Sequence, residues 1–225
     1  MSVFPLPRAL KGALGLLVFG LSLLAFSPLS LAQEGESAPV KAALTPQGQF
    51  IQKLGDKALA ILSDKTTSAQ DKNNQFHKML LNAFDLNVIG RYVIGRVGWA
   101  VASEEQRTEY QSLFEKLVVQ MYLDRFALYT DEGFQVTGTT PESDRDTLVN
   151  SQITHPDGSP PASVAWRVRT TGKKMHVLDV IIEGVSMSLT QNREYTAVLQ
   201  RNGGDVEALL DMMRQRVAGK SSSDS

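Results

Sequence analysis

The 225-residue sequence contains no cysteine. A chain without cysteine forms no disulfide bond and offers no thiolate that acts as a nucleophile or holds zinc or an iron–sulfur cluster. It also lacks the thiol to which prenyl groups and S-linked acyl groups are attached. The missing residue type therefore excludes thiol enzymes, thiolate metal centres and cysteine-anchored lipoproteins.

An excess of positive charge is also missing. Lys and Arg total 23 and Asp and Glu total 24, so the formal net charge is −1. Proteins that bind nucleic acid without sequence preference need a basic surface that neutralises phosphates. The charge balance therefore argues against a general nucleic-acid-binding protein.

Residues typical of catalytic and metal sites are scarce. The three histidines, His77, His155 and His176, lie in separate segments without HExxH spacing. Asp179 and Glu183 stand four residues apart on an expected strand, so both could lie on one face as an acid–base pair. Structural hydrogen bonds are the commoner role of such carboxylates. We therefore expect no catalytic residue, no metal site and no cofactor.

The first 32 residues differ in composition from the rest of the chain. Their only charged side chains are Arg8 and Lys11, and an apolar run over residues 12–26 follows, with small residues at positions −3 and −1 of a cut after residue 32. This layout predicts a cleavable signal peptide, because a permanent membrane span needs about 20 apolar residues. We expect export to the periplasm of a Gram-negative bacterium, with residues 33–44 as a flexible leader.

Helical periodicity dominates the first half of the mature chain. Thr45 and Pro46 are typical of an N-cap followed by a first-turn proline, and Ser103 with Gln106 has capping-box spacing. Apolar residues recur every three or four positions in four stretches. Four helices are expected. The first begins at Pro46, and the second covers about 69–84. The third runs from the Asp85 cap to Gly95, and the fourth extends from Ser103 through Phe126.

After Gly133 the period of the apolar residues changes from about 3.6 to 2, as in antiparallel strands. Helical periodicity returns at 189–201 and again after Asp205. The order of helices, sheet and helices predicts a single α+β domain over residues 45–218, with a loose polar tail over 219–225. Four strands are expected, at residues 134–139, 146–154, 162–170 and 174–183.

Basic residues cluster around the expected hairpin between the last two strands: Arg167, Arg169, Lys173 and Lys174. A solvated hairpin face is the commoner role of such a cluster. The alternative is contact with a phosphate headgroup or with an acidic partner surface. The sequence leaves both roles open.

Several segments taken together resemble one family. They are IGRYVIGR at 89–96, the helix over 103–129, Trp166-Arg167, LDVIIEGVS at 178–186, QNREY at 191–195 and GGD at 203–205. In order and spacing the set is similar to the MlaC family, the periplasmic phospholipid-binding proteins of the Mla lipid-asymmetry pathway, also called the toluene-tolerance or ABC-transporter auxiliary family. The resemblance covers nearly all of the mature chain, and the D-V-x-x-E-G-V-S run is its most specific part.

The resemblance implies an antiparallel sheet of about four strands, wrapped by N- and C-terminal helices around an apolar lipid cavity. It implies a carrier that moves phospholipid between an outer-membrane lipoprotein–porin complex and an inner-membrane ABC transporter with an MCE-domain subunit. We expect a monomer whose cargo is phospholipid. The residues expected to contact the lipid are Tyr92, Val93, Leu117, Met121, Leu128, Val164, Trp166, Val168, Val180 and Ile182.

Two other classes of function are compatible with the sequence. A periplasmic enzyme would use Asp179 and Glu183 for acid–base chemistry. A lipid-free adaptor would have a packed core and would regulate an envelope transporter through surface charges. Composition does not decide between them, because a hydrophobic fraction of 42% permits lipid carriage without requiring it.

Overall fold

The structure is a computed structural model that describes residues 43–126 and 131–221. The expected signal peptide, most of the leader, and Leu128 lie outside the described residues. The described helices are α1 (Pro46–Ser63), α2 (Ala69–Ala83), α3 (Leu86–Val101), α4 (Glu104–Phe126), α5 (Met187–Arg201) and α6 (Val206–Ser221). The described strands are β1 (Gly133–Pro141), β2 (Asp146–Thr154), β3 (Ala162–Thr171), β4 (Lys174–Ile182) and β5 (Val185–Ser186).

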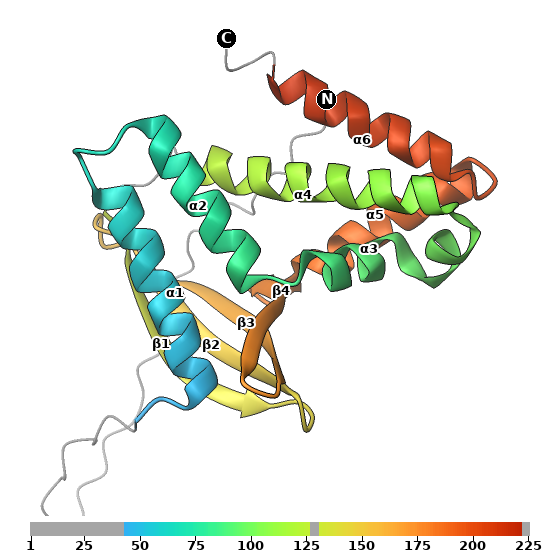
Figure 1. Ribbon diagram of the computed structural model, residues 1–225. Helices are drawn as coiled ribbons and strands as arrows, with labels where there is room; N and C mark the ends of the chain where they lie inside the picture. Colours follow the sequence, from blue (N-terminus) through green and yellow to red (C-terminus); the bar gives the residue numbers. More distant parts are fainter. Residues whose placement is uncertain (1–42, 127–130, 222–225) are drawn as a thin grey trace, which may run out of the picture. The chain divides into compact units, whose positions relative to one another are not determined.

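The strands form one antiparallel sheet in the order β1-β2-β3-β4-β5, so each strand pairs with its neighbour in sequence (Figure 1). The α+β fold and its four long strands are confirmed, and the two-residue β5 adds a fifth strand that the alternation did not predict. The β3–β4 hairpin turns at Gly172, whose φ of 60° suits glycine. Helix α1 packs on β1 and β2, and α5 packs on β4.

The helix starts confirm the predicted caps. Thr45 Oγ1 accepts a hydrogen bond of 3.2 Å from the Gly48 N–H. At α4 the capping box is complete, because Gln106 N–H donates to Ser103 Oγ and Ser103 N–H donates to Gln106 Oε1, at 3.2 and 3.1 Å. Asp85 Oδ1 caps α3 by accepting from the Val88 N–H at 3.1 Å. Local polar residues therefore determine where these helices begin.

The backbone leaves the helical conformation at Gly95, where the sequence predicted a helix end, and a second helical segment follows directly, so that α3 runs across a kink to Val101. Gly95 has φ 79° and ψ 163°, a region that only glycine occupies without strain. At the bend, the carbonyl groups of Tyr92 and Val93 accept hydrogen bonds of 3.0 and 3.1 Å from Asn192 Nδ2. Helix α5 thus supplies donors where a kink takes carbonyl groups out of the helical ladder.

Replacing Gly95 by alanine is expected to lower the free energy of unfolding by about 1–3 kcal/mol, because the observed backbone conformation is strained for any residue with a Cβ atom. Urea denaturation followed by circular dichroism measures the change. Gly138→Ala is the matched control, since a Cβ at Gly138 meets no atom within 4 Å and its φ is not positive. Equal losses in the two variants would contradict the special role of Gly95.

The buried apolar side chains form two clusters. The helical core lies among the helices and includes the fully buried Tyr110, Tyr195 and Leu209. The sheet core lies between α1 and the sheet and includes Ile51 and Val149. The two cores meet along a seam, at which partly buried side chains pack against both clusters.

The C-terminal helix is longer than expected. Helix α6 continues to Ser221, so residues 219–221 of the predicted loose tail are helical, and residues 222–225 lie outside the described part. Within residues 43–126 and 131–221, no helix combines the length and the apolar character needed to cross a bilayer.

Candidate functional site

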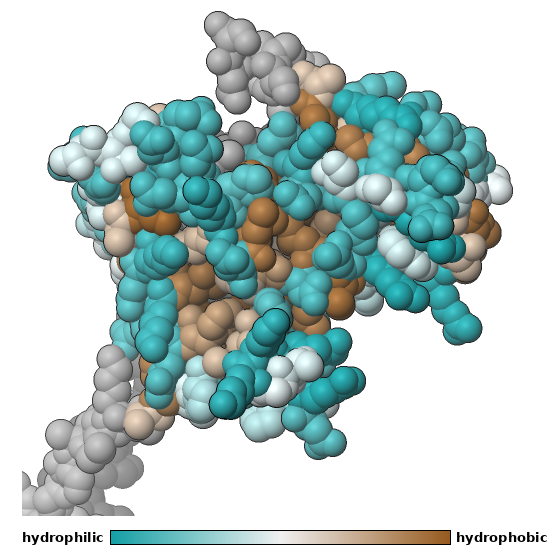
Figure 2. Space-filling model, viewed as in Figure 1, coloured by the Kyte–Doolittle hydropathy of each residue, from teal (hydrophilic) through white to brown (hydrophobic). Residues whose placement is uncertain are grey.

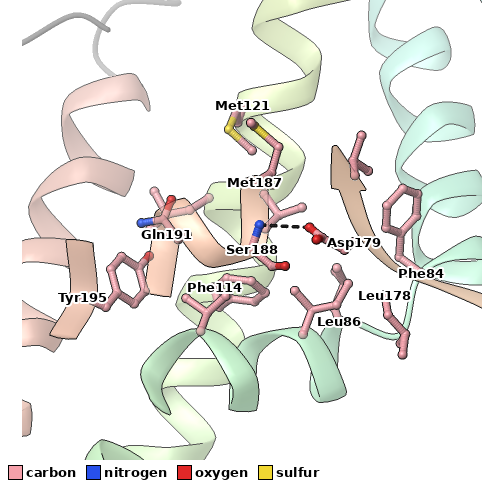
Figure 3. A pocket seen from close by; sticks show the side chains of 15 residues that line it. Phe84, Leu86, Phe114, Met121, Leu178, Asp179, Met187, Ser188, Gln191 and Tyr195 are labelled. Carbon is pink, nitrogen blue, oxygen red and sulfur yellow. Dashed lines mark hydrogen bonds between the residues drawn. The ribbon is translucent and has the colours of Figure 1, made fainter. Parts of the chain in front are cut away.

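An apolar cavity of about 90 Å³ lies at the seam between the helical core and the sheet core (Figure 3). We call it the seam cavity. Its walls come from the end of α2, from α3 and α4, from β4 and from the start of α5. The lining residues are Phe84, Leu86, Ile89, Val93, Phe114, Leu117, Val118, Met121, Leu178, Asp179, Val180, Met187, Ser188, Gln191 and Tyr195.

Apolar side chains gather on one face of the protein. Figure 2 shows them in a hollow between α1, α4 and the β3–β4 hairpin, bordered by polar residues. Figure 3 shows Met121 of α4 and Met187 of α5 at one end of the cavity. Unbranched, polarisable methionine side chains adapt to surfaces of different shape. This end of the cavity is therefore lined by side chains that can change shape.

A β-bulge brings three consecutive residues of β4 to the cavity. On β3, Arg167 pairs with Asp179 and Val168 pairs with Val177, so Leu178 has no partner in the register. A bulge bends its strand and changes which face the next side chains occupy. As a result Leu178, Asp179 and Val180 all line the seam cavity, which strict alternation along a strand does not permit.

Two aromatic rings, those of Phe114 and Tyr195, line the helical side of the cavity, and Tyr110 packs against both from outside the lining. The ring of Tyr110 stacks on Phe114 at 5.9 Å between centroids and meets the ring of Tyr195 edge-on at 6.2 Å. Tyr110 Oη donates a hydrogen bond of 2.8 Å to the Gly90 carbonyl oxygen. Burial raises the pKa of Tyr110 and of Tyr195 well above the usual value for a phenol. Both rings therefore stay neutral, and the wall stays apolar.

Asp179 is the one carboxylate among the described lining residues, and it is 4% exposed. Its Oδ1 accepts from the Ser188 N–H at 3.1 Å, and its Oδ2 accepts from Ser186 Oγ at 2.7 Å and from Arg167 Nη1 at 3.2 Å. Ser186 is the N-cap of α5, so the carboxylate lies at the positive end of that helix dipole. Asp179 thus ties β4 to α5.

Glu183 has a different structural role from Asp179. It stands in the turn before β5 with φ 48°, and its Oε1 accepts a hydrogen bond from the Ser163 N–H at 2.5 Å. The two carboxylates are held by separate partners, so the geometry lends no support to an acid–base pair. The described residues also contain no group of three or more His, Cys, Asp or Glu side chains able to hold a metal ion.

The structure divides the residues predicted to contact lipid among three places, and Leu128 lies outside the described part. The seam cavity brings together Val93, Leu117, Met121 and Val180. The sheet core contains Val164 and Val168, with Trp166 and Ile182 packed against it. Tyr92 is 52% exposed and lines a separate groove on α3.

Sequence reasoning missed the contribution of α5 to the cavity. Met187, Gln191 and Tyr195 follow one another at intervals of four residues and all line it. This spacing places them on one face of a helix. The four-residue spacing was visible in the sequence, but it did not show which part of the protein this face of the helix packs against.

The basic cluster at the β3–β4 hairpin is partly neutralised. Arg167 Nε lies 2.7 Å from Glu142 Oε2, and Arg169 contacts both oxygens of Asp146 at 2.7 Å. The hydrogen bonds from Arg169 lower the pKa of Asp146. Lys173 is exposed at the turn, as is the adjoining Lys174. Contact of this cluster with a headgroup or a partner remains a prediction.

Three comparisons relate the chain to known proteins. The family model described as MlaC protein matches residues 52–215. The toluene tolerance protein Ttg2D of Pseudomonas putida is 23% identical over 117 residues, which are 52% of this chain and 54% of that protein. The chain therefore matches about half the length of this curated relative.

The third comparison concerns the fold. The solved structure of the phospholipid-binding protein from Ralstonia solanacearum, in complex with a phospholipid, is similar with a TM-score of 0.68 and 22% identity. The similarity covers 77% of this chain and 98% of that one. Because the family model also matches most of the sequence, the chain belongs to the MlaC family.

Proposed function

We propose that this protein is a periplasmic phospholipid carrier and that the seam cavity takes the lipid tails. The observation that carries the proposal is an apolar cavity between two separate cores in a chain of the MlaC family. A solved protein with the same fold is described as a phospholipid-binding protein in complex with a phospholipid, which supports the same cargo here.

The energetics of lipid tails explain why a carrier needs an enclosed site. Each buried CH₂ group contributes about 0.8 kcal/mol, so exposing one long acyl chain to water costs on the order of 10 kcal/mol. A surface patch of a few hundred Å² leaves much of two such chains wet. The tails must therefore enter the protein, between its layers.

The seam cavity must widen before it holds an acyl chain. Its volume is about 90 Å³, whereas an engineered apolar cavity that binds benzene measures about 150 Å³, and an acyl chain has more than twice as many carbon atoms as benzene. Widening the seam moves Val93 and Leu117 of the helical side away from Val180 and Met187 of the sheet side. Such a movement separates apolar surfaces without breaking the hydrogen-bond ladder of the sheet.

The proposal extends to the route of the carrier, and membership of the MlaC family supports it. The predicted signal peptide delivers the chain to the periplasm, where it moves phospholipid between an outer-membrane lipoprotein–porin complex and an inner-membrane ABC transporter with an MCE-domain subunit. Transfer of intact lipid needs no bond to form or break.

Native mass spectrometry of the mature protein purified from periplasm tests the proposal, together with lipid extraction from the same sample. We expect one or more phospholipid molecules per protein molecule. The identity of the extracted lipids gives the number of acyl chains that the site holds. Protein that carries no lipid, and that takes up none from phospholipid vesicles, would contradict the carrier function.

The volume of the seam cavity favours a second candidate, a lipid-free adaptor that regulates an envelope transporter. A cavity of about 90 Å³ is compatible with a packed core that never opens. The same experiment distinguishes the two candidates, because an adaptor would be purified without bound lipid and would not take up lipid from vesicles.

A further inference from the structure

A second opening lies on α3, outside the seam cavity. It is an open groove of about 710 Å³, which we call the Trp99 groove. The kink at Gly95 redirects the second half of α3, and Asn192 of α5 forms part of the lining. The lining residues are Arg91, Tyr92, Gly95, Arg96, Trp99, Ala100, Arg107 and Asn192.

Two arginines are held against the indole of Trp99. The guanidinium carbon of Arg91 lies 5.4 Å from the ring centroid, and that of Arg107 lies 5.3 Å from it. Arg107 also donates from Nε to the Trp99 carbonyl oxygen at 2.9 Å. Stacking on an aromatic ring holds a guanidinium by cation–π attraction. The groove therefore presents positive charge in a defined place.

This positive charge is not neutralised within the described part of the chain. None of Arg91, Arg96 and Arg107 forms an ion pair with a described carboxylate, and the lining of the groove contains no acidic residue. Planar guanidinium groups bind carboxylates in a bidentate manner. The groove is thus a place where acidic groups from another molecule would find partners.

Exposed aliphatic side chains lie on the same segment of α3 that supplies Trp99 to the groove. Val97 is 76% exposed and Val101 is 61% exposed, and both follow the Gly95 kink on α3. Together with Tyr92 and Trp99 they give the surface an apolar component beside its charges. Arginine, tryptophan and tyrosine are the residues enriched in the energetic centres of protein–protein interfaces.

We propose that the Trp99 groove is a docking surface for a protruding segment of a partner protein that combines acidic with aliphatic side chains. Three features favour a protein over a membrane. The surface is hollowed, its charge comes from arginine without lysine, and the net charge of the whole chain is −1, which gives no long-range attraction to an anionic bilayer.

Random twelve-residue peptides displayed on phage and selected on the purified mature protein test this assignment. We expect the selected peptides to be enriched in Asp and Glu together with Leu and Val. Fluorescence anisotropy with the best peptide then gives its Kd for each variant. The double variant Arg91→Glu/Arg96→Glu should bind it at least 10-fold more weakly.

The control is Lys65→Glu/Arg145→Glu, which makes the same charge change at two exposed positions outside the groove. It should keep the Kd of the unaltered protein. Binding to vesicles with and without phosphatidylglycerol is measured in parallel, as are the thermal melt and the phospholipid content of every variant. If the groove variant loses affinity for the peptide but keeps its phospholipid content, the loss comes from the groove and not from a failure to carry lipid.

Two results would overturn the docking surface. The first is a selected peptide pool without acidic enrichment, or one whose binding is equal in the groove variant and the control. The second is a groove variant that loses affinity only for vesicles with phosphatidylglycerol, which would assign the groove to a membrane surface instead.

Discussion

Replacing Leu117 by aspartate should reduce the phospholipid bound per protein by 10-fold or more. Leu117 lines the seam cavity from α4, so the new carboxylate would face the lipid tails. A charge in an apolar site must give up its hydration or keep water beside the tails, and both cost several kcal/mol. Mass spectrometry of lipid extracted from equal amounts of variant and unaltered protein measures the loss.

Leu81→Asp provides the matched control. Leu81 is 40% exposed on α2 and does not line the cavity, so the same substitution there should leave the lipid content unchanged. Leu117 is itself only partly buried, which keeps the two variants comparable in folding. Full lipid content in Leu117→Asp would mean that the tails bind elsewhere, and the sheet-core residues Val164 and Val168 would then be the first to test.

Removing the Asp179 carboxylate should lower the free energy of unfolding more than the other substitutions that are tested by urea denaturation. Asp179→Ala takes away the acceptor for the Ser188 N–H and for Ser186 Oγ, and it leaves Arg167 with Glu142 alone. Breaking a buried ion pair costs about 3–5 kcal/mol. Since the Arg167 side chain is 35% exposed, we expect about 2–4 kcal/mol. Urea denaturation measures the difference.

Glu142→Ala removes the other partner of the same arginine, and that partner is exposed. It should cost less than about 1 kcal/mol, as exposed ion pairs do. Equal losses in Asp179→Ala and Glu142→Ala would show that burial at the β4–α5 junction does not matter. Turnover of a small apolar substrate that Asp179→Asn abolishes without loss of stability would instead favour the enzyme.

The sequence by itself determined the features that depend on near neighbours. Apolar periods of about 3.6 and 2 predict the helices and the four long strands, and polar residues such as Thr45 and Ser103 mark helix starts within three residues of their partners. These features follow from interactions between residues close in the chain. The order of several short segments also indicated the family before any fold was known.

Tertiary structure alone decided what each predicted face packs against. The alternation of Val164 and Val168 marks an inward face of β3, but only the folded chain shows that this face belongs to the sheet core rather than to the cavity. The bulge at Leu178 reverses the alternation in β4. Its position depends on pairing with β3, which a pattern within one strand does not contain.

Gly95 shows where the local signal ends. A glycine in a helical pattern indicates a break, and the helix is interrupted at Gly95 as predicted. The sequence did not show that a second helical segment follows at once, or that Asn192, far away in the sequence, hydrogen-bonds the carbonyl groups at the bend. The Trp99 groove depends on distant segments in the same way. Its residues come from α3, α4 and α5, and packing between segments distant in the chain, not local periodicity, places them together.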